Sequence, residues 1–127
     1  MLVMDTHETL CTLRTQETYG FLDITDDVKD AVAASSVVAG RITVFSPSDR
    51  CPLVANERES GLLRDIKRAV IRLKESSGEG APDSIGSSSL VLPIVDGVLR
   101  LGTWQRLLLF ELDKPTERQV VMQIVGE

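Results

Sequence analysis

Four consecutive apolar residues, Leu107 to Phe110, place the strongest constraint on how this chain folds. They lie within a segment, 104–112, whose composition predicts a β-strand. Because successive side chains of a strand point to opposite faces, both faces of this strand need cover. Helices can cover one face, so the other face must meet a second sheet or another subunit.

Two segments carry helix signals. Residues 23–27 predict the start of a first helix, with Thr25 as the N-cap and two aspartates favoured by the helix dipole. A second helix is predicted over 60–76, because apolar residues recur there at three- and four-residue spacing. That apolar stripe consists of Leu62, Leu63, Ile66, Ala69, Val70 and Leu73. Basic residues, among them Arg64 and Arg68, lie on a different face of the same helix.

The remaining pattern is one of strands and turns. Strands are predicted over 9–15, 41–45, 53–55, 90–95, 98–101, 104–112 and 118–125. Asp96-Gly97 is the dipeptide best suited to a tight hairpin turn. The Ser- and Gly-rich segment 76–89 is expected to be a long loop, either functional or disordered. Together these elements predict one α+β domain over 1–127, a mostly antiparallel sheet or sandwich with two helices.

The composition excludes some classes of binding partner. The 127 residues carry a net charge of −5, which argues against nonspecific nucleic-acid binding. The apolar run Leu90 to Val95 is far shorter than the ~20 residues that span a bilayer, and we expect neither a membrane span nor a signal peptide. Without such a signal, reduced cysteines and a cytoplasmic location are expected, although the spacing of Cys11 and Cys51 alone leaves a disulfide open.

Several residues are candidates for chemistry, each with a simpler alternative. Cys51 follows a cation that can lower a thiol pKa, but it is also explained as an ordinary semi-buried cysteine. Glu57 is either a functional carboxylate or a residue of the first helical turn, and Asp65 is either catalytic or a surface ion-pair partner. Trp104 is either core or a ligand platform, and Gln105 can serve a pocket with its amide.

The assembled pattern resembles the YjbQ-like family, whose members are described as secondary thiamine-phosphate synthase enzymes. The resemblance runs along nearly the whole chain, and its most specific motif is Gly102-Thr103-Trp104-Gln105 after the Asp96-Gly97 hairpin. The other matching segments are Asp23-Ile24-Thr25, Gly40 with Val44-Phe45, Asn56-Glu57, Leu62 to Ile66, Leu92-Pro93, Glu111-Leu112-Asp113, Pro115, Arg118 and Gln123 to Glu127. The resemblance implies an α+β fold that assembles as a homotrimer, with pockets near subunit boundaries.

The chain departs from this family at histidine. The family is associated with histidine-lined metal sites, but this chain has one histidine, His7, outside all the matched segments. Ser48-Asp49-Arg50 stand where a His-Thr-Thr motif is normal. Asp49 and Glu57 would make only a weak site for a hard cation, and Arg50 would repel it. We therefore predict that the metal site is lost, with no resident cofactor beyond a weakly held magnesium ion accompanying a phosphate ligand.

Three functional hypotheses follow. The first is a non-catalytic trimeric scaffold or small-anion-binding protein. The second is thiamine-phosphate synthase activity, with Arg50, Arg64 or Arg118 holding phosphate and Glu57 or Asp65 a bridging magnesium. The third is a thiol role for Cys51, which requires a lowered pKa. The candidate anion-binding residues are Ser48, Asp49, Arg50, Asn56, Arg64, Trp104, Gln105 and Arg118.

Overall fold

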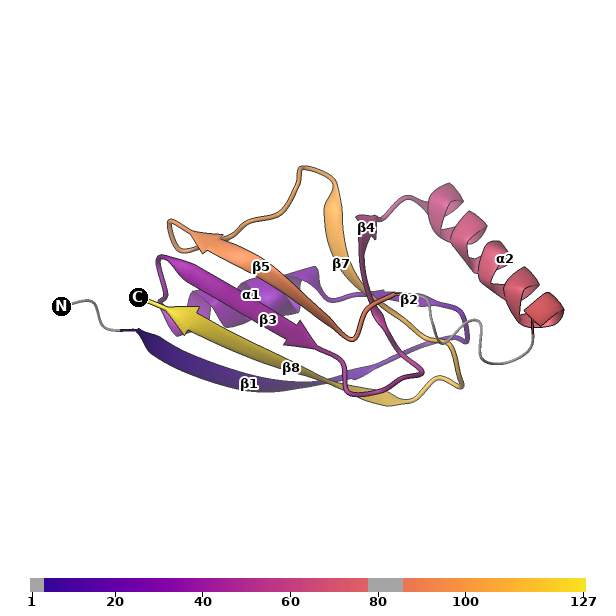
Figure 1. Ribbon diagram of the computed structural model, residues 1–127, viewed down its shortest axis with the longest axis horizontal. Coiled ribbons are helices and arrows are strands. Elements are labelled where there is room, and N and C mark those ends of the chain that lie inside the picture. Colours follow the sequence, from indigo (N-terminus) through magenta and orange to yellow (C-terminus); the bar gives the residue numbers. More distant parts are fainter. Residues whose placement is uncertain (1–3, 78–85) are drawn as a thin grey trace.

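Two antiparallel sheets form the body of the protein (Figure 1). The computed structural model describes residues 4–77 and 86–127. The elements follow the order β1 (Asp5–Arg14), β2 (Phe21–Asp23), α1 (Thr25–Ser35), β3 (Gly40–Phe45), β4 (Leu53–Glu57), α2 (Ser60–Ser77), β5 (Ser89–Val95), β6 (Val98–Leu99), β7 (Gln105–Phe110) and β8 (Glu117–Gly126). One sheet has the strand order β1-β8-β3-β5-β6, and the other has the order β2-β7-β4. The predicted α+β class is confirmed.

The strand with four apolar residues is covered on both faces, as its sequence requires. Leu107 to Phe110 are all fully buried in β7. Leu107 and Leu109 join the large core between the sheets, together with residues such as Ile42. Phe110 instead packs in a second cluster with Val70 of α2. A second sheet and a helix of the same chain therefore provide the cover for β7.

The first helix begins where it was predicted to begin, but its start is built differently. Val28 and Val32 of α1 are buried in the main core, and Figure 1 shows α1 behind the five-stranded sheet. Thr25 is not the N-cap: it is the first helical residue, and the side chain of the cap residue Ile24 makes no capping hydrogen bond. Instead, Oδ1 of Asp23 accepts hydrogen bonds from both the backbone N–H and the hydroxyl of Thr25.

The second helix confirms the predicted helical segment but is only partly covered. Val70 is buried on α2, whereas Leu62 and Leu73 of the same apolar stripe remain exposed. Glu59 closes the start of the helix, because its carboxylate accepts hydrogen bonds from the N–H groups of Gly61 and Leu62. Those two bonds lower the pKa of Glu59. Glu57, predicted as a possible first-turn residue, is instead the last residue of β4.

Local sequence patterns predicted the Asp96-Gly97 turn but not the ends of several strands. Asp96 and Gly97 both have positive φ, 54° and 76°, as a tight hairpin turn between β5 and β6 requires. The predicted strands 98–101 and 104–112 are too long, since β6 has two residues and β7 six. The predicted strands 9–15 and 53–55 are shorter than the observed β1 and β4, and β2 was not predicted.

Most of the predicted loop 76–89, namely 78–85, lies outside the described residues. Neither described helix is long and apolar enough to cross a membrane.

Candidate functional site

A buried ion pair joins the end of β7 to the start of β8. Arg118 donates from Nε to Oε1 of Glu111 at 2.9 Å and from Nη2 to Oε2 at 2.7 Å. Glu111 is fully buried, and its Oε1 also accepts a hydrogen bond from the Thr15 hydroxyl at 2.7 Å. This two-point geometry fixes the plane of the guanidinium group.

The surroundings of this pair favour the charged forms of both Glu111 and Arg118. Burial alone raises the pKa of Glu111, but the hydrogen bonds from Arg118 and Thr15 outweigh it and the pKa is lowered on balance. The same carboxylate raises the pKa of Arg118. Both groups are therefore charged at neutral pH, and Arg118 is a fixed cation.

Ser48 lies beside Nη1 of Arg118, the guanidinium nitrogen that does not bind Glu111. Its hydroxyl oxygen accepts a hydrogen bond from Nη1 of Arg118 at 3.0 Å and another from the backbone N–H of Arg50 at 3.2 Å. A hollow of about 310 Å³ opens here. It is lined by Thr12, Pro47, Ser48, Glu117, Arg118 and Gln119. We call it the Ser48 hollow.

The neighbouring candidates contribute to this region in different ways. The Arg50 side chain is directed to the other side of the loop, where Nη2 donates to the carbonyl of Leu112 at 3.3 Å and Nε lies 3.9 Å from the carboxylate of Asp113. Asp49 is exposed on the turn. Ser48 and Arg118 thus line the hollow together, and Arg50 supports Ser48 through the hydrogen bond from its backbone N–H.

The residues at this position do not fit the metal ion that the resemblance implies. The structure places a guanidinium nitrogen 3.0 Å from the hydroxyl oxygen of Ser48, and a cation there repels a metal ion. Within residues 4–77 and 86–127, no group of three or more His, Cys, Asp and Glu side chains could hold a metal ion. His7 lies on β1 and is not among the residues that line the hollow.

A second group of candidates lies at the other end of β4. Asn56 and Glu57 pair with Arg106 and Gln105 of β7. A hollow of about 510 Å³ is lined there by Glu57, Arg58, Glu59, Thr103, Trp104 and Arg106. We call it the Trp104 hollow. Trp104 is 73% exposed, so the alternative that it belongs to the core is wrong.

Polar contacts fix the walls of the Trp104 hollow. Asp23 accepts hydrogen bonds from Nε of Arg106 at 2.8 Å and from Nη1 of Arg58 at 3.3 Å. Burial raises the pKa of Asp23, but the bonds from Arg106 and Thr25 lower it on balance. The amide oxygen of Gln105 accepts the N–H of Gly102 at 2.8 Å, so this amide holds a turn.

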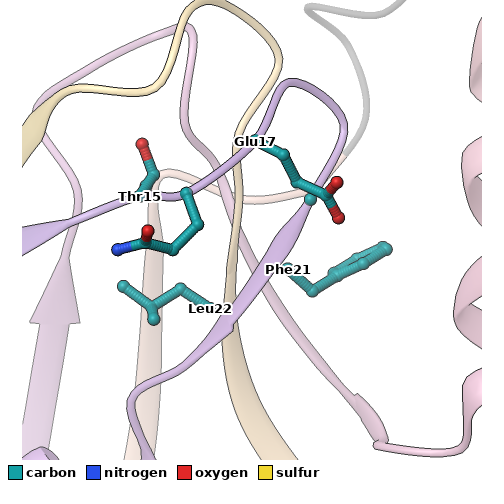
Figure 2. Close-up of a pocket in the computed structure, with 6 residues that line it drawn as sticks. Thr15, Glu17, Phe21 and Leu22 are labelled. Carbon is teal, nitrogen blue, oxygen red and sulfur yellow. The ribbon is translucent and has the colours of Figure 1, made fainter.

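The candidates of the second helix lie elsewhere again. Arg64 lines a groove of about 300 Å³ with Tyr19, Phe21 and Lys67, while Asp65 is exposed on α2. A smaller hollow of about 160 Å³ adjoins the turn that leads into β2. In Figure 2, Glu17 lies beside Phe21, and Thr15 and Leu22 lie on the opposite side of this hollow. The predicted anion-binding residues therefore do not form one site.

Cys51 has the opposite of the environment that a reactive thiol needs. Its side chain is fully buried, and burial together with the charge of Glu111 raises its pKa to about 12. Both cysteines are free, which answers the open question of a disulfide. The hypothesis of a reactive thiol required a lowered pKa at Cys51, and the raised pKa shows that this hypothesis is wrong.

The sequence reasoning missed two carboxylates that organise these sites, Glu111 and Asp23. A signal was present for Glu111, since an acid directly follows four buried apolar residues and needs a partner. For Asp23 the only local signal was its position before a helix. Its arginine partners, Arg58 and Arg106, come from two other strand ends.

The fold and these sites define a class: a two-sheet α+β protein with a buried arginine–glutamate pair beneath a polar hollow. Residues 9–127 match the family model described as UPF0047 protein YjbQ-like. A UPF0047 protein of Archaeoglobus fulgidus is 34% identical over 124 residues, covering 88% of this chain and 96% of that protein. The chain belongs to the YjbQ-like (UPF0047) family.

Solved structures agree with this assignment. A YbjQ-like protein of unknown function from Sulfolobus solfataricus P2 superposes with a TM-score of 0.89 at 30% identity, covering 98% of this chain and 100% of that one. An uncharacterized conserved protein of the yjbq/upf0047 family from Clostridium acetobutylicum gives 0.83 at 31% identity, with 91% and 98% covered. The resemblance proposed from sequence motifs is thereby confirmed.

Proposed function

We propose that this protein binds a small anion, such as inorganic phosphate or a phosphate-bearing molecule, in the Ser48 hollow without catalysing a reaction on it. The supporting observation is the hydrogen-bond state of Ser48. Its oxygen already accepts from Arg118 and from the N–H of Arg50, which uses both lone pairs. Its proton is therefore free to be donated to an acceptor in the hollow.

The surroundings supply further donors. Thr12 and Gln119 line the hollow with a hydroxyl and an amide, and Arg118 contributes a guanidinium group whose positive charge is balanced by Glu111. Glu111 holds the arginine from behind, so the guanidinium is oriented before a ligand arrives. Among the described residues that line the hollow Glu117 is the one acid, and it limits how much negative charge the ligand can carry.

The assembly and location belong to the same proposal. The family resemblance supports a homotrimer that serves as a scaffold for these sites. The free state of both cysteines supports a reducing compartment such as the cytoplasm.

Calorimetric titration of the full chain with inorganic phosphate tests the anion site. We expect saturable binding that Ser48→Ala weakens at least several-fold, because the variant removes the free hydroxyl donor. Thr103→Ala, at the rim of the Trp104 hollow, is the matched control and should bind like the wild type. Absence of saturable binding, or equal loss in both variants, would contradict the proposal.

The alternative is thiamine-phosphate synthase activity, which joins a pyrimidine pyrophosphate to a thiazole phosphate and releases pyrophosphate. The Trp104 hollow favours it, because an exposed indole beside Arg58 and Glu57 suits a flat ring carrying phosphate. A magnesium ion would enter only with the phosphate groups. Growth of a strain lacking its main thiamine-phosphate synthase, restored by this chain but not by Trp104→Ala, would establish this alternative instead.

A further inference from the structure

The groove of about 300 Å³ at Arg64 runs between helix α2 and the turn that leads into β2. Its walls come from segments more than forty positions apart in the sequence. They consist of Leu63, Arg64 and Lys67 on α2 and of Glu17, Tyr19, Gly20 and Phe21 on the turn and β2. In Figure 2 the side chains of Glu17 and Phe21 both extend toward the helix. We call this site the α2 groove.

The α2 groove has an aromatic lining. Phe21 stacks on Phe110, with ring centroids 4.3 Å apart and an angle of 7° between the ring planes. Phe110 is fully buried, whereas Phe21 is half-buried and lines the groove. Tyr19 and Leu63, both half-buried, add apolar surface beside it. A flat ring in the groove therefore extends an aromatic cluster that is already packed.

Two cations of α2 lie beside this aromatic lining. Arg64 and Lys67 are three positions apart, so they are neighbours on the helix surface. Among the residues that the structure describes, neither has a carboxylate within the 4.0 Å of an ion pair, although the charge of Arg64 helps to lower the pKa of Glu59. Both cations are therefore able to pair with a carboxylate that enters the groove.

Glu17 sets the charge that the groove accepts. It is the one acid among the described residues of the lining, so the lining carries a net charge of +1 in a chain of −5. Such a lining balances a ligand with a single negative charge, and Glu17 repels a second one. Inorganic phosphate has no apolar surface to place on Phe21, so the α2 groove favours a different ligand from the Ser48 hollow.

The turn that forms one wall is held firmly against the body of the protein. Tyr19 has a φ of 60°, and its backbone N–H donates to the carbonyl of Glu111 at 2.6 Å. The carbonyl of Gly20 accepts the N–H of Glu111 at 2.9 Å. The ammonium group of Lys74 lies 5.8 Å from the centre of the Tyr19 ring and joins the end of α2 to the same turn. The groove is therefore formed before a ligand arrives.

We propose that the α2 groove binds a small aromatic monocarboxylate as a free molecule. The ring lies against Phe21 and Leu63, and the carboxylate pairs with Arg64 and Lys67. Ligand pockets measure about 300–1,000 Å³, so the volume of this groove suits a molecule of one or two rings. None of its described lining residues also lines the Ser48 hollow or the Trp104 hollow, so the site is separate from both.

Calorimetric titration of the full chain with naphthoate, a two-ring monocarboxylate, tests the proposal. We expect saturable binding that Lys67→Gln weakens at least several-fold, because that variant removes one of the two cations. Arg68→Gln is the matched control: Arg68 is exposed on the same helix but is not among the lining residues, so this variant should bind like the wild type. Phe21→Leu keeps apolar volume but removes the ring, and it should also weaken binding. Absence of saturable binding, or equal loss in Lys67→Gln and Arg68→Gln, would overturn the proposal.

Related ligands test the chemical class. Naphthalene dicarboxylate should bind the wild type several-fold more weakly than naphthoate, and Glu17→Gln should narrow that difference. Naphthylmethylamine, a cation of similar shape, should bind more weakly still. Equal affinity for the three ligands would overturn the charge assignment, and tighter binding of a peptide that ends in phenylalanine would show that the groove receives a chain end instead.

Two controls separate this site from the other hollows. Trp104→Ala should keep its naphthoate affinity, and a loss there would overturn the proposal by placing the ligand in the Trp104 hollow. Excess inorganic phosphate should leave naphthoate binding unchanged, and displacement by phosphate would overturn the separation from the Ser48 hollow. Ser48→Ala should also bind naphthoate like the wild type, so failure of the phosphate site leaves this result intact.

Discussion

Arg118 holds both carboxylate oxygens of Glu111, at 2.9 and 2.7 Å, across the connection from β7 in one sheet to β8 in the other. Glu111 is fully buried and the side chain of Arg118 is 14% exposed. A charge pair in this setting is costly to break, because removing one partner leaves the other buried and uncompensated. The pair also orients the arginine toward Ser48, so it links the stability of the fold to the geometry of the hollow.

Glu111→Gln is expected to lower the free energy of unfolding by roughly 3–5 kcal/mol, the range for breaking one side of a buried pair. Urea denaturation measures the change. Asp113→Asn is the matched control, since Asp113 is 53% exposed and lies 3.9 Å from Arg50. An exposed pair of that kind contributes at most about 1 kcal/mol. Equal effects of the two substitutions would show that burial does not govern the Glu111 pair.

The same pair predicts a pH dependence. Because the pKa of Glu111 is lowered in the folded protein, the ionised pair stabilises the fold above the usual carboxyl value of 4.5. That stabilisation is lost as the pH falls through the lowered pKa. The stability difference between wild type and Glu111→Gln should therefore be largest near neutral pH and shrink in acid. Urea denaturation at a series of pH values measures it, and a difference that stays constant into acid would contradict the assignment.

The sequence predicted elements whose signals are local. The apolar spacing from Leu62 to Leu73 predicted α2, and Asp96-Gly97 predicted its turn, because both patterns depend only on neighbouring residues. The strand β2 has three residues and exists through its pairing with β7, where the rings of Phe21 and Phe110 stack at 4.3 Å. Such a contact joins segments 89 positions apart and leaves no local pattern.

The candidate site was predicted residue by residue but not as an arrangement. Ser48 and Glu57 are nine positions apart, yet Glu57 is at the far end of the extended strand β4, whose length separates the two hollows. Ser48 and Arg118 were predicted as separate candidates, and only the pairing of β3 with β8 brings them together. A lone tryptophan is more often part of the core than a ligand platform, so the sequence did not reveal that Trp104 is exposed.

Thr25 connects the start of α1 to β7, and its hydroxyl is predicted to matter more than its methyl group. The hydroxyl donates to Asp23 at 2.6 Å and accepts the N–H of Leu107 at 2.9 Å, in a fully buried position. Thr25→Val keeps the shape but leaves a buried N–H without this acceptor, at an expected cost of about 1–3 kcal/mol. Thr25→Ser keeps both bonds and loses only a methyl group. Urea denaturation should rank Ser above Val, and the reverse order would contradict the role of the hydroxyl.

Cys51 is predicted to be inert to alkylation in the folded protein. With its pKa raised to about 12, about one thiol in ten thousand is ionised at pH 8, and the buried sulfur is also out of reach. Iodoacetamide followed by mass spectrometry on Cys11→Ser, which retains Cys51, should show no label in native buffer and full label in denaturant. Cys51→Ser is the matched control: Cys11 is half-buried, so it should react in native buffer, although burial and Asp27 raise its pKa and slow it below a free thiol. Labelling of Cys51 in the native Cys11→Ser variant at the rate of a free thiol would refute both its burial and its raised pKa, and would reopen the thiol hypothesis.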